Sequence, residues 1–306
     1  MVRARTSLPP HPLDATPLQL ILAALAAAAG AAVNAIAGGG TLITFPTLIA
    51  IGVPPIVANA TSSVALWPGT VGSMWGYRRE LAGSRAWAVR FAIPSLLGGM
   101  AGALLLLRTS SDDFAAIVPF LVLGATVLFI AQGPLATYLK RRQAGASAVE
   151  GLGEAPSAVT KAERFPGEGT AHIASAALET TGPEPLRAPP IAFLVYQFLV
   201  SIYGGYFGAG MGILMLAALG FMGLVNIHQM NGLKNWGGTC INLVAVTIFA
   251  VSGIVSWPIA LVMAVGAAVG GYAGSGLAQR VEQRTVRRLI IVIGLASGVW
   301  LLIQQM

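Results

Sequence analysis

Polar side chains that could bind an anion lie in two short stretches of an otherwise apolar chain. The amide, hydroxyl and ammonium groups concerned belong to Asn59, Ser62, Ser63, Asn231, Lys234 and Asn235. At about 100° per residue of a helix, the members of each stretch fall on one face. Amide and hydroxyl groups are costly when they face lipid, so each polar face should meet a cavity or a neighbouring helix.

Lys234 is the only charged residue well inside any predicted membrane span. Insertion of a lysine at the bilayer centre costs on the order of 3 kcal/mol, so a lysine in this position indicates a functional role. We interpret it as the positive charge that faces an anionic substrate. The alternative is that Lys234 lies close enough to the helix start, near His228, for its amine to reach the headgroups.

Two glycine clusters, Gly38–Gly40 and Gly208–Gly212, each precede an apolar run that is short for a membrane span, at 41–51 and 211–224. The pattern predicts a broken or re-entrant helix, whose free N–H groups and positive end can solvate an anion. The predicted contributors are Gly39, Gly40, Thr41, Gly210 and Gly212. The alternative is that these glycines only allow tight helix packing.

Groups that catalysis or metal binding requires are missing from the sequence pattern. His11, His172 and His228 show no ligand spacing, and no carboxylate pair falls within a predicted span. The single cysteine, Cys240, excludes a disulfide within the chain and a cysteine-rich metal site. We therefore predict neither an enzyme nor a cofactor or metal.

Composition indicates the elements that must position these residues. The 306 residues are 56% hydrophobic and 9% charged, whereas soluble domains carry about a quarter charged residues. The predicted fold is therefore an all-α polytopic membrane protein. Its apolar segments lie at 17–37, 41–51, 57–77, 86–107, 114–132, 191–208, 211–224, 229–253, 257–278 and 287–304.

The two halves of the chain match in sequence. A shift of 172 positions superimposes Asn59 on Asn231 and Ser62 on Lys234, and also aligns Gly98 with Gly270. The chain therefore consists of two repeats of about five hydrophobic elements each. Between and before them lie polar segments, so the expected division is a disordered tail at 1–16, repeats at 17–132 and 191–306, and a flexible cytoplasmic linker at 133–190.

The net charge of +7 reflects topology rather than nucleic-acid binding. If each repeat crosses the membrane an odd number of times and Arg78 is cytoplasmic, 14 of the 18 lysines and arginines lie inside, against 12 for an even number. Basic residues concentrate in cytoplasmic loops, which favours the odd number. The two repeats are therefore predicted to be inverted, as in many transporters.

Four motifs occur in order: the glycines at 38–40, then NATSSVALWPG at 59–69, GYRREL at 76–81 and NGLKN at 231–235. Together they resemble the sulfite exporter TauE/SafE family, and the resemblance covers both repeats. It implies a bacterial inner-membrane permease that moves sulfite, sulfonates or other small organic anions, usually outward.

The expected function is a secondary transporter, in the exporting direction, of a small oxyanion such as sulfite or an organosulfonate. Its expected partners are that anion and the lipid bilayer, with a homo-oligomer left open. Two alternatives remain at this point: a passive anion channel, and a membrane-embedded assembly or sensory subunit whose linker recruits a cytoplasmic partner.

Overall fold

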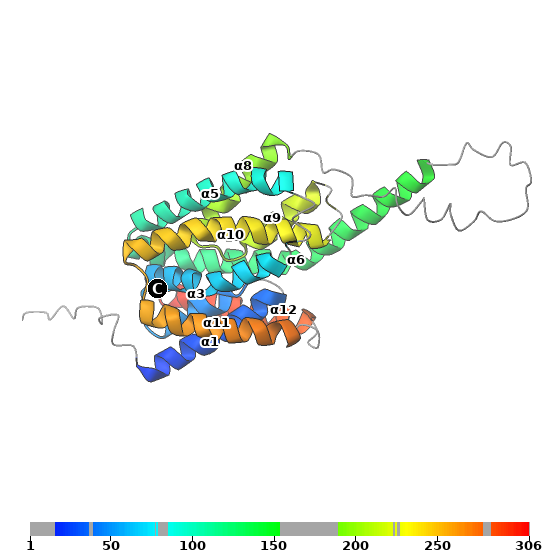
Figure 1. The fold of residues 1–306 in the computed structure, drawn as a ribbon. Coiled ribbons are helices and arrows are strands. Elements are labelled where there is room, and N and C mark those ends of the chain that lie inside the picture. Colours follow the sequence, from blue (N-terminus) through cyan, green and yellow to red (C-terminus); the bar gives the residue numbers. More distant parts are fainter. Residues whose placement is uncertain are drawn as a thin grey trace, which may run out of the picture.

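The computed structural model describes residues 16–36, 39–76, 78, 85–153, 189–222, 224, 227–277 and 283–305. All regular secondary structure within these residues is helical, which confirms the predicted all-α class (Figure 1). The predictions for the tail before Thr16, for Gly38 and for linker residues 154–188 lie outside the described residues. The helices are α1 (Pro17–Ile36), α2 (Thr41–Ala50), α3 (Pro55–Gly76), α5 (Arg85–Arg108), α6 (Ser111–Gly153), α8 (Ile191–Tyr206), α9 (Met211–Phe221), α10 (Ile227–Ser252), α11 (Trp257–Leu277) and α12 (Gln283–Ile303).

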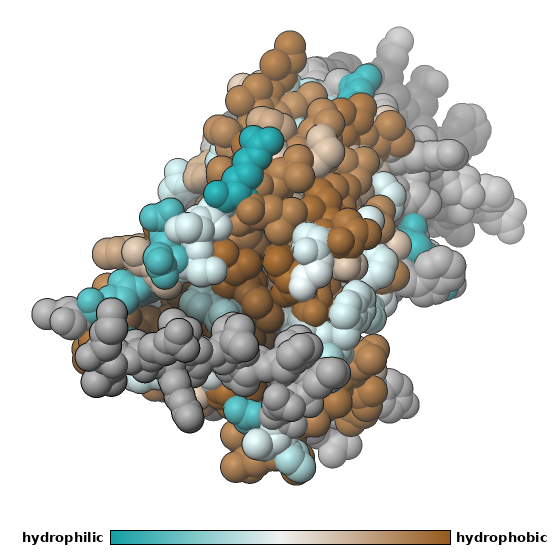
Figure 2. All heavy atoms as spheres, turned by 90° about the vertical axis from the view of Figure 1, so that its left-hand side faces the viewer, coloured by the Kyte–Doolittle hydropathy of each residue, from teal (hydrophilic) through white to brown (hydrophobic). Residues whose placement is uncertain are grey.

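Four of the described helices are long and apolar enough to cross a membrane, namely at Pro17–Asn34, Ala86–Arg108, Ser111–Ala131 and Gln229–Ser252. Large hydrophobic side chains also remain exposed on the outside of the bundle, among them Ile191 and Val265. Figure 2 shows hydrophobic residues over most of the coloured surface in its view. An exposed apolar surface of this kind, on helices long enough to cross a bilayer, is typical of contact with lipid.

The short helices α2 and α9 fold back along the helices before them. The Gln19 amide at the start of α1 donates to the Ile51 carbonyl just after α2, at 2.8 Å. The Tyr196 hydroxyl of α8 likewise donates to the Leu214 carbonyl of α9, at 3.2 Å. Each short element therefore forms a hairpin with its predecessor, and a helix of 10 or 11 residues is only about 15 Å long, too short to cross the roughly 30 Å hydrocarbon core.

Helix α6 is longer than its apolar run. It continues as a helix through Gly153 and projects from the bundle (Figure 1), although the sequence predicts a linker from residue 133 onward. Four alanines in this extension favour a helix, but four glycines and Pro134 disfavour it, so helix propensity alone does not account for the added turns.

Glycines bring helices of different halves into backbone contact. Gly98 and Gly102 of α5 lie against the Phe198 and Ile202 carbonyls of α8, so a Cβ at either glycine would overlap them. In the other half, Gly266 and Gly270 of α11 lie against α1 in the same way. These glycines are packing residues, as four-residue spacing suggests.

The contacts also give the relative directions of the helices. Gly98 meets Phe198 and Gly102 meets Ile202, so α5 and α8 run parallel. The Gln305 amide after α12 donates to the Ala115 carbonyl near the start of α6, so these two helices run antiparallel. Such directions agree with halves that cross the membrane in opposite senses, and the inverted relation itself stays a prediction.

Candidate functional site

Lys234 of α10 reaches the first turn of α9. A Cβ built on Gly212 would lie 3.3 Å from the Lys234 Cδ and 4.0 Å from its Cε, so the methylene stem rests directly on this glycine. Gly212 lies nine residues before Phe221, the last residue of α9, so helical rise puts it roughly 14 Å from that end. The Lys234 side chain is therefore partly buried against the inner end of a short helix.

The beginning of α9 presents a free donor at this point. Gly210 adopts the left-handed conformation, with φ of 79° and ψ of −2°, and caps the helix without a side-chain hydrogen bond. The Ile213 N–H donates to the Gly210 carbonyl at 3.0 Å, whereas the Gly212 N–H has no acceptor among the described residues. An N–H group at the positive end of a helix dipole, beside an ammonium group, is suited to bind an anion.

The polar side chains next to Lys234 on α10 have no hydrogen-bond partner among the described residues. Asn231 and Asn235 are partly buried, and within the described part of the chain neither side-chain amide makes a hydrogen bond. The Lys234 amine likewise forms no hydrogen bond or ion pair with any described residue. The second predicted polar stretch, Asn231, Lys234 and Asn235, therefore has donor groups that make no hydrogen bond within the described residues.

The first polar stretch is used differently. The Ser62 hydroxyl of α3 lies 2.6 Å from the Thr44 hydroxyl of α2, and the Ser63 hydroxyl donates to the Asn59 carbonyl at 2.9 Å. The Asn59 amide group donates to the Tyr206 carbonyl at the end of α8, at 2.9 Å. The Ser62 and Asn59 bonds link α3 to α2 and α8, whereas the Ser63 bond lies within α3. No hydrogen bond links these side chains to Lys234 among the described residues.

The two glycine breaks meet on the same helix. A Cβ on Gly39 (φ 91°) would lie 2.9 Å from the Phe129 ring of α6, and a Cβ on Gly210 would lie 3.6 Å from the Ala125 Cα. Ala125 and Phe129 are one helical turn apart. The rings of Phe45 and Phe207 also pack edge to face across the two halves, with centroids 5.3 Å apart. Sequence patterns did not identify α6 as the common wall, because an alanine and a phenylalanine inside an apolar span carry no distinguishing signal.

The rest of the first glycine break is covered by protein. Gly40 packs against Gly30 of α1, and Thr41, the first residue of α2, is partly buried. Gly39 and Gly40 are thus in contact with neighbouring helices, as is Gly210 with α6, while Gly212 lies beside the lysine.

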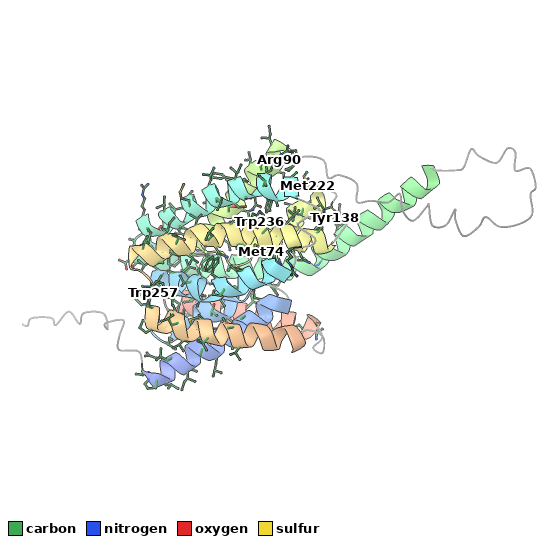
Figure 3. All side chains as sticks on the ribbon, in the orientation of Figure 1. Met74, Arg90, Tyr138, Met222, Trp236 and Trp257 are labelled. Carbon is green, nitrogen blue, oxygen red and sulfur yellow. The ribbon has the colours of Figure 1, made fainter. Side chains whose placement is uncertain are left out.

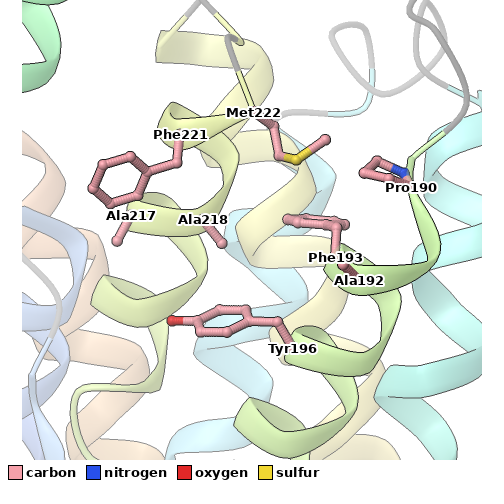
Figure 4. A pocket seen from close by; sticks show the side chains of 8 residues that line it. All are labelled: Pro190, Ala192, Phe193, Tyr196, Ala217, Ala218, Phe221 and Met222. Carbon is pink, nitrogen blue, oxygen red and sulfur yellow. The ribbon is translucent and has the colours of Figure 1, made fainter.

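A separate apolar pocket of about 300 Å³ opens between α8 and α9 (Figure 4). Its lining includes Phe193, Tyr196 and Phe221 and does not include Lys234. It lacks the positive charge that an anion site needs. In the described part of the chain, no group of three His, Cys, Asp or Glu residues could hold a metal ion.

The chain is similar to known membrane proteins. The model of the family described as Sulfite exporter TauE/SafE matches residues 22–301. The chain belongs to the TauE/SafE family. It is a multi-pass membrane protein of a transporter family.

Curated relatives of this TauE/SafE protein carry transporter names. "Probable membrane transporter protein ORF9" of Sinorhizobium sp is 25% identical over 274 residues, covering 88% of this chain and 87% of that protein. A "Probable membrane transporter protein" of Haemophilus influenzae is 22% identical over 268 residues, covering 85% and 86%. "Probable membrane transporter protein YfcA" of Escherichia coli strain K12 is 25% identical over 280 residues, covering 88% and 84%. No solved structure matches the chain.

Proposed function

We propose that this protein is a secondary transporter of a small oxyanion, such as sulfite or an organosulfonate, and that it exports this anion across the bacterial inner membrane. The observation that carries the proposal is the Lys234 stem resting on Gly212 at the beginning of α9. This contact favours a lysine that faces substrate over one that extends to the headgroups.

The chemistry of the site suits an anion with several oxygens. The Lys234 ammonium supplies a full positive charge, and the Gly212 N–H and the α9 dipole add to it. Hydrogen bonds to a charged group contribute about 1.5–3 kcal/mol each, roughly twice as much as neutral ones. Asn231 and Asn235, on the same helix, would complete the shell with neutral donors.

The arrangement of the two hairpins supports transport rather than static binding. The two glycine breaks contact α6 one turn apart, so a substrate beside Gly210 would lie where the halves meet. In transporters built from inverted repeats, such a central site is reached alternately from either side as the halves move.

Export needs no coupling carboxylate. An inside-negative membrane favours the outward movement of an anion by about 2.3 kcal/mol per charge per 100 mV. The membrane potential is therefore a sufficient driving force for a monovalent or divalent oxyanion.

The test is flux of sulfite, sulfate, thiosulfate, sulfoacetate and taurine through the purified protein in proteoliposomes, at a set membrane potential. We expect saturable flux of one or more sulfur oxyanions, lost in Lys234→Gln and kept in Ser62→Ala, the matched position of the other half. Flux that rises linearly with concentration would indicate a channel. Absence of both binding and flux for every anion would contradict the proposal and favour the assembly or sensory role.

A further inference from the structure

A groove on the outer surface of the bundle does not include Lys234 in its lining. The groove, of about 360 Å³, runs between α5 and α8. Its walls are apolar except for Arg90 at one end, and they include Ile93 and Leu97 of α5 and Ile191, Val195 and Phe198 of α8.

The groove exists because the two parallel helices separate toward their beginnings. At Gly98 and Gly102 the backbones touch. Nearer the helix starts, the rings of Phe91 and Phe193 stack with their centroids 5.7 Å apart, so side chains rather than backbones make the contact. The lining is highly exposed, with Ile191 at 80% and Ile93 at 58% of its surface accessible, so in a membrane an apolar surface such as an acyl chain covers it favourably.

Arg90 gives the groove a charged end. It is exposed and makes no hydrogen bond or ion pair with a described residue. Figure 3 places Arg90 at the side of the bundle from which the α6 extension projects. Arg90 is five residues into α5, so it lies roughly 8 Å from the helix start, within reach of the headgroup layer. The positive end of α8, which begins at Ile191 on the groove, adds to the same potential.

We propose that this groove binds one anionic phospholipid, with its phosphate on Arg90 and an acyl chain along Ile93, Leu97 and Val195. Charge complementarity identifies the ligand: an unpaired guanidinium recognises a phosphate through paired hydrogen bonds, and the adjoining walls offer nothing polar. This end of α5 is also the predicted cytoplasmic end, where anionic lipids attract basic residues.

Native mass spectrometry of the purified full chain tests the proposal, with equal amounts of phosphatidylglycerol and phosphatidylcholine added. We expect retention of phosphatidylglycerol over phosphatidylcholine, and Arg90→Gln should weaken phosphatidylglycerol binding about fivefold, the effect of one basic group at a membrane surface. Arg108→Gln is the matched control, because Arg108 is an exposed arginine at the opposite end of the same helix. It should leave retention unchanged.

Two further variants fill the apolar part of the groove while keeping Arg90. Leu97→Trp from α5 and Val195→Trp from α8 should each reduce phosphatidylglycerol retention, and folding is checked by thermal unfolding of each protein. Equal retention by the wild type, Arg90→Gln and Arg108→Gln would overturn the proposal. It would also be overturned if the tryptophan variants converted a dimer to a monomer with lipid retention unchanged, because the groove would then be a contact between two copies.

Discussion

At the level of single residues, equivalent positions of the two repeats have taken different roles. Ser62 and Lys234 align in the duplication, and each contacts the short helix of its own half, Ser62 through Thr44 and Lys234 through Gly212. The sequence singles out Lys234, because a charge in a span is costly wherever it lies, and its role in binding stays a prediction. It could not predict that Asn59 is bound to the Tyr206 carbonyl, because the partner is a backbone group 147 positions away.

Replacement of Lys234 tests the charge. We expect Lys234→Gln to abolish binding of the transported anion while the fold is kept, because the change removes both the main attraction and an intramembrane charge. Lys234→Arg should keep part of the affinity, and Asn231→Ala or Asn235→Ala should each cost on the order of 1 kcal/mol. Isothermal titration of the purified variants measures their affinity for the anion. An unchanged affinity in Lys234→Gln would contradict a substrate-facing lysine.

Replacement of the glycines at the beginning of α9 separates binding from stability. In Gly212→Ala the new methyl group would lie 3.3 Å from the Lys234 Cδ, so the stem must shift and we expect weaker anion binding with little loss of stability. Gly210→Ala places a side chain at φ 79°, which should lower the free energy of unfolding by about 1–2 kcal/mol.

Gly238→Ala is the control for the glycine variants. Its methyl group would make an ordinary 3.6 Å contact with the Met211 Cε, so both binding and stability should hold. Thermal unfolding and anion titration on the same preparations distinguish the three variants. Normal binding in Gly212→Ala would show that the position of the lysine stem does not matter to the site.

At the level of elements, the sequence predicted the short helices but not their course. Runs of about ten apolar residues after glycine clusters are too short to span, yet both a broken span and a hairpin fit that length. The choice depends on tertiary contacts such as that from Gln19 to the Ile51 carbonyl. Similarly, the apolar run of α6 ends near residue 132, whereas the helix continues to Gly153 through residues of mixed helix propensity.

The contact between α5 and α8 gives a prediction for helix packing. Gly102→Ala would place a methyl group on the Ile202 carbonyl, so we expect the free energy of unfolding to fall by about 1–3 kcal/mol, as for overpacked cores. Gly124→Ala on α6 meets nothing within 4 Å and replaces a helical glycine, so stability should hold or rise by up to about 1 kcal/mol. Thermal unfolding in detergent compares the two, and equal stability would show that α5 and α8 can separate without cost.

At the level of the whole molecule, the duplication is legible in the sequence, whereas the pairing between halves is not. Glycines at four-residue spacing indicate that a helix packs closely, but they do not identify the helix on which it packs. In the structure the first helix of each hairpin packs on the other half: α1 on α11 and α8 on α5. Exchange of the halves turns one of these contacts into the other, so the same set of interfaces is used twice.

The paired interfaces and the helix directions predict a membrane topology that labelling can measure. If the halves are inverted, Arg78, the linker and the segment from Arg280 to Arg288 all face the cytoplasm, because that arrangement places most lysines and arginines inside. Single cysteines are introduced at Arg78, Arg280 and Arg108 in a Cys240→Ala background and labelled from one side of the membrane with an impermeant maleimide. Cys240 is buried, so its replacement by a small residue should preserve the fold. We expect the cysteines at 78 and 280 to react from the cytoplasmic side and the cysteine at 108 from the opposite side.

Reaction at 78 and 280 from opposite sides would mean that both halves cross the membrane in the same sense. The central anion site would then lack the symmetry on which alternating access depends.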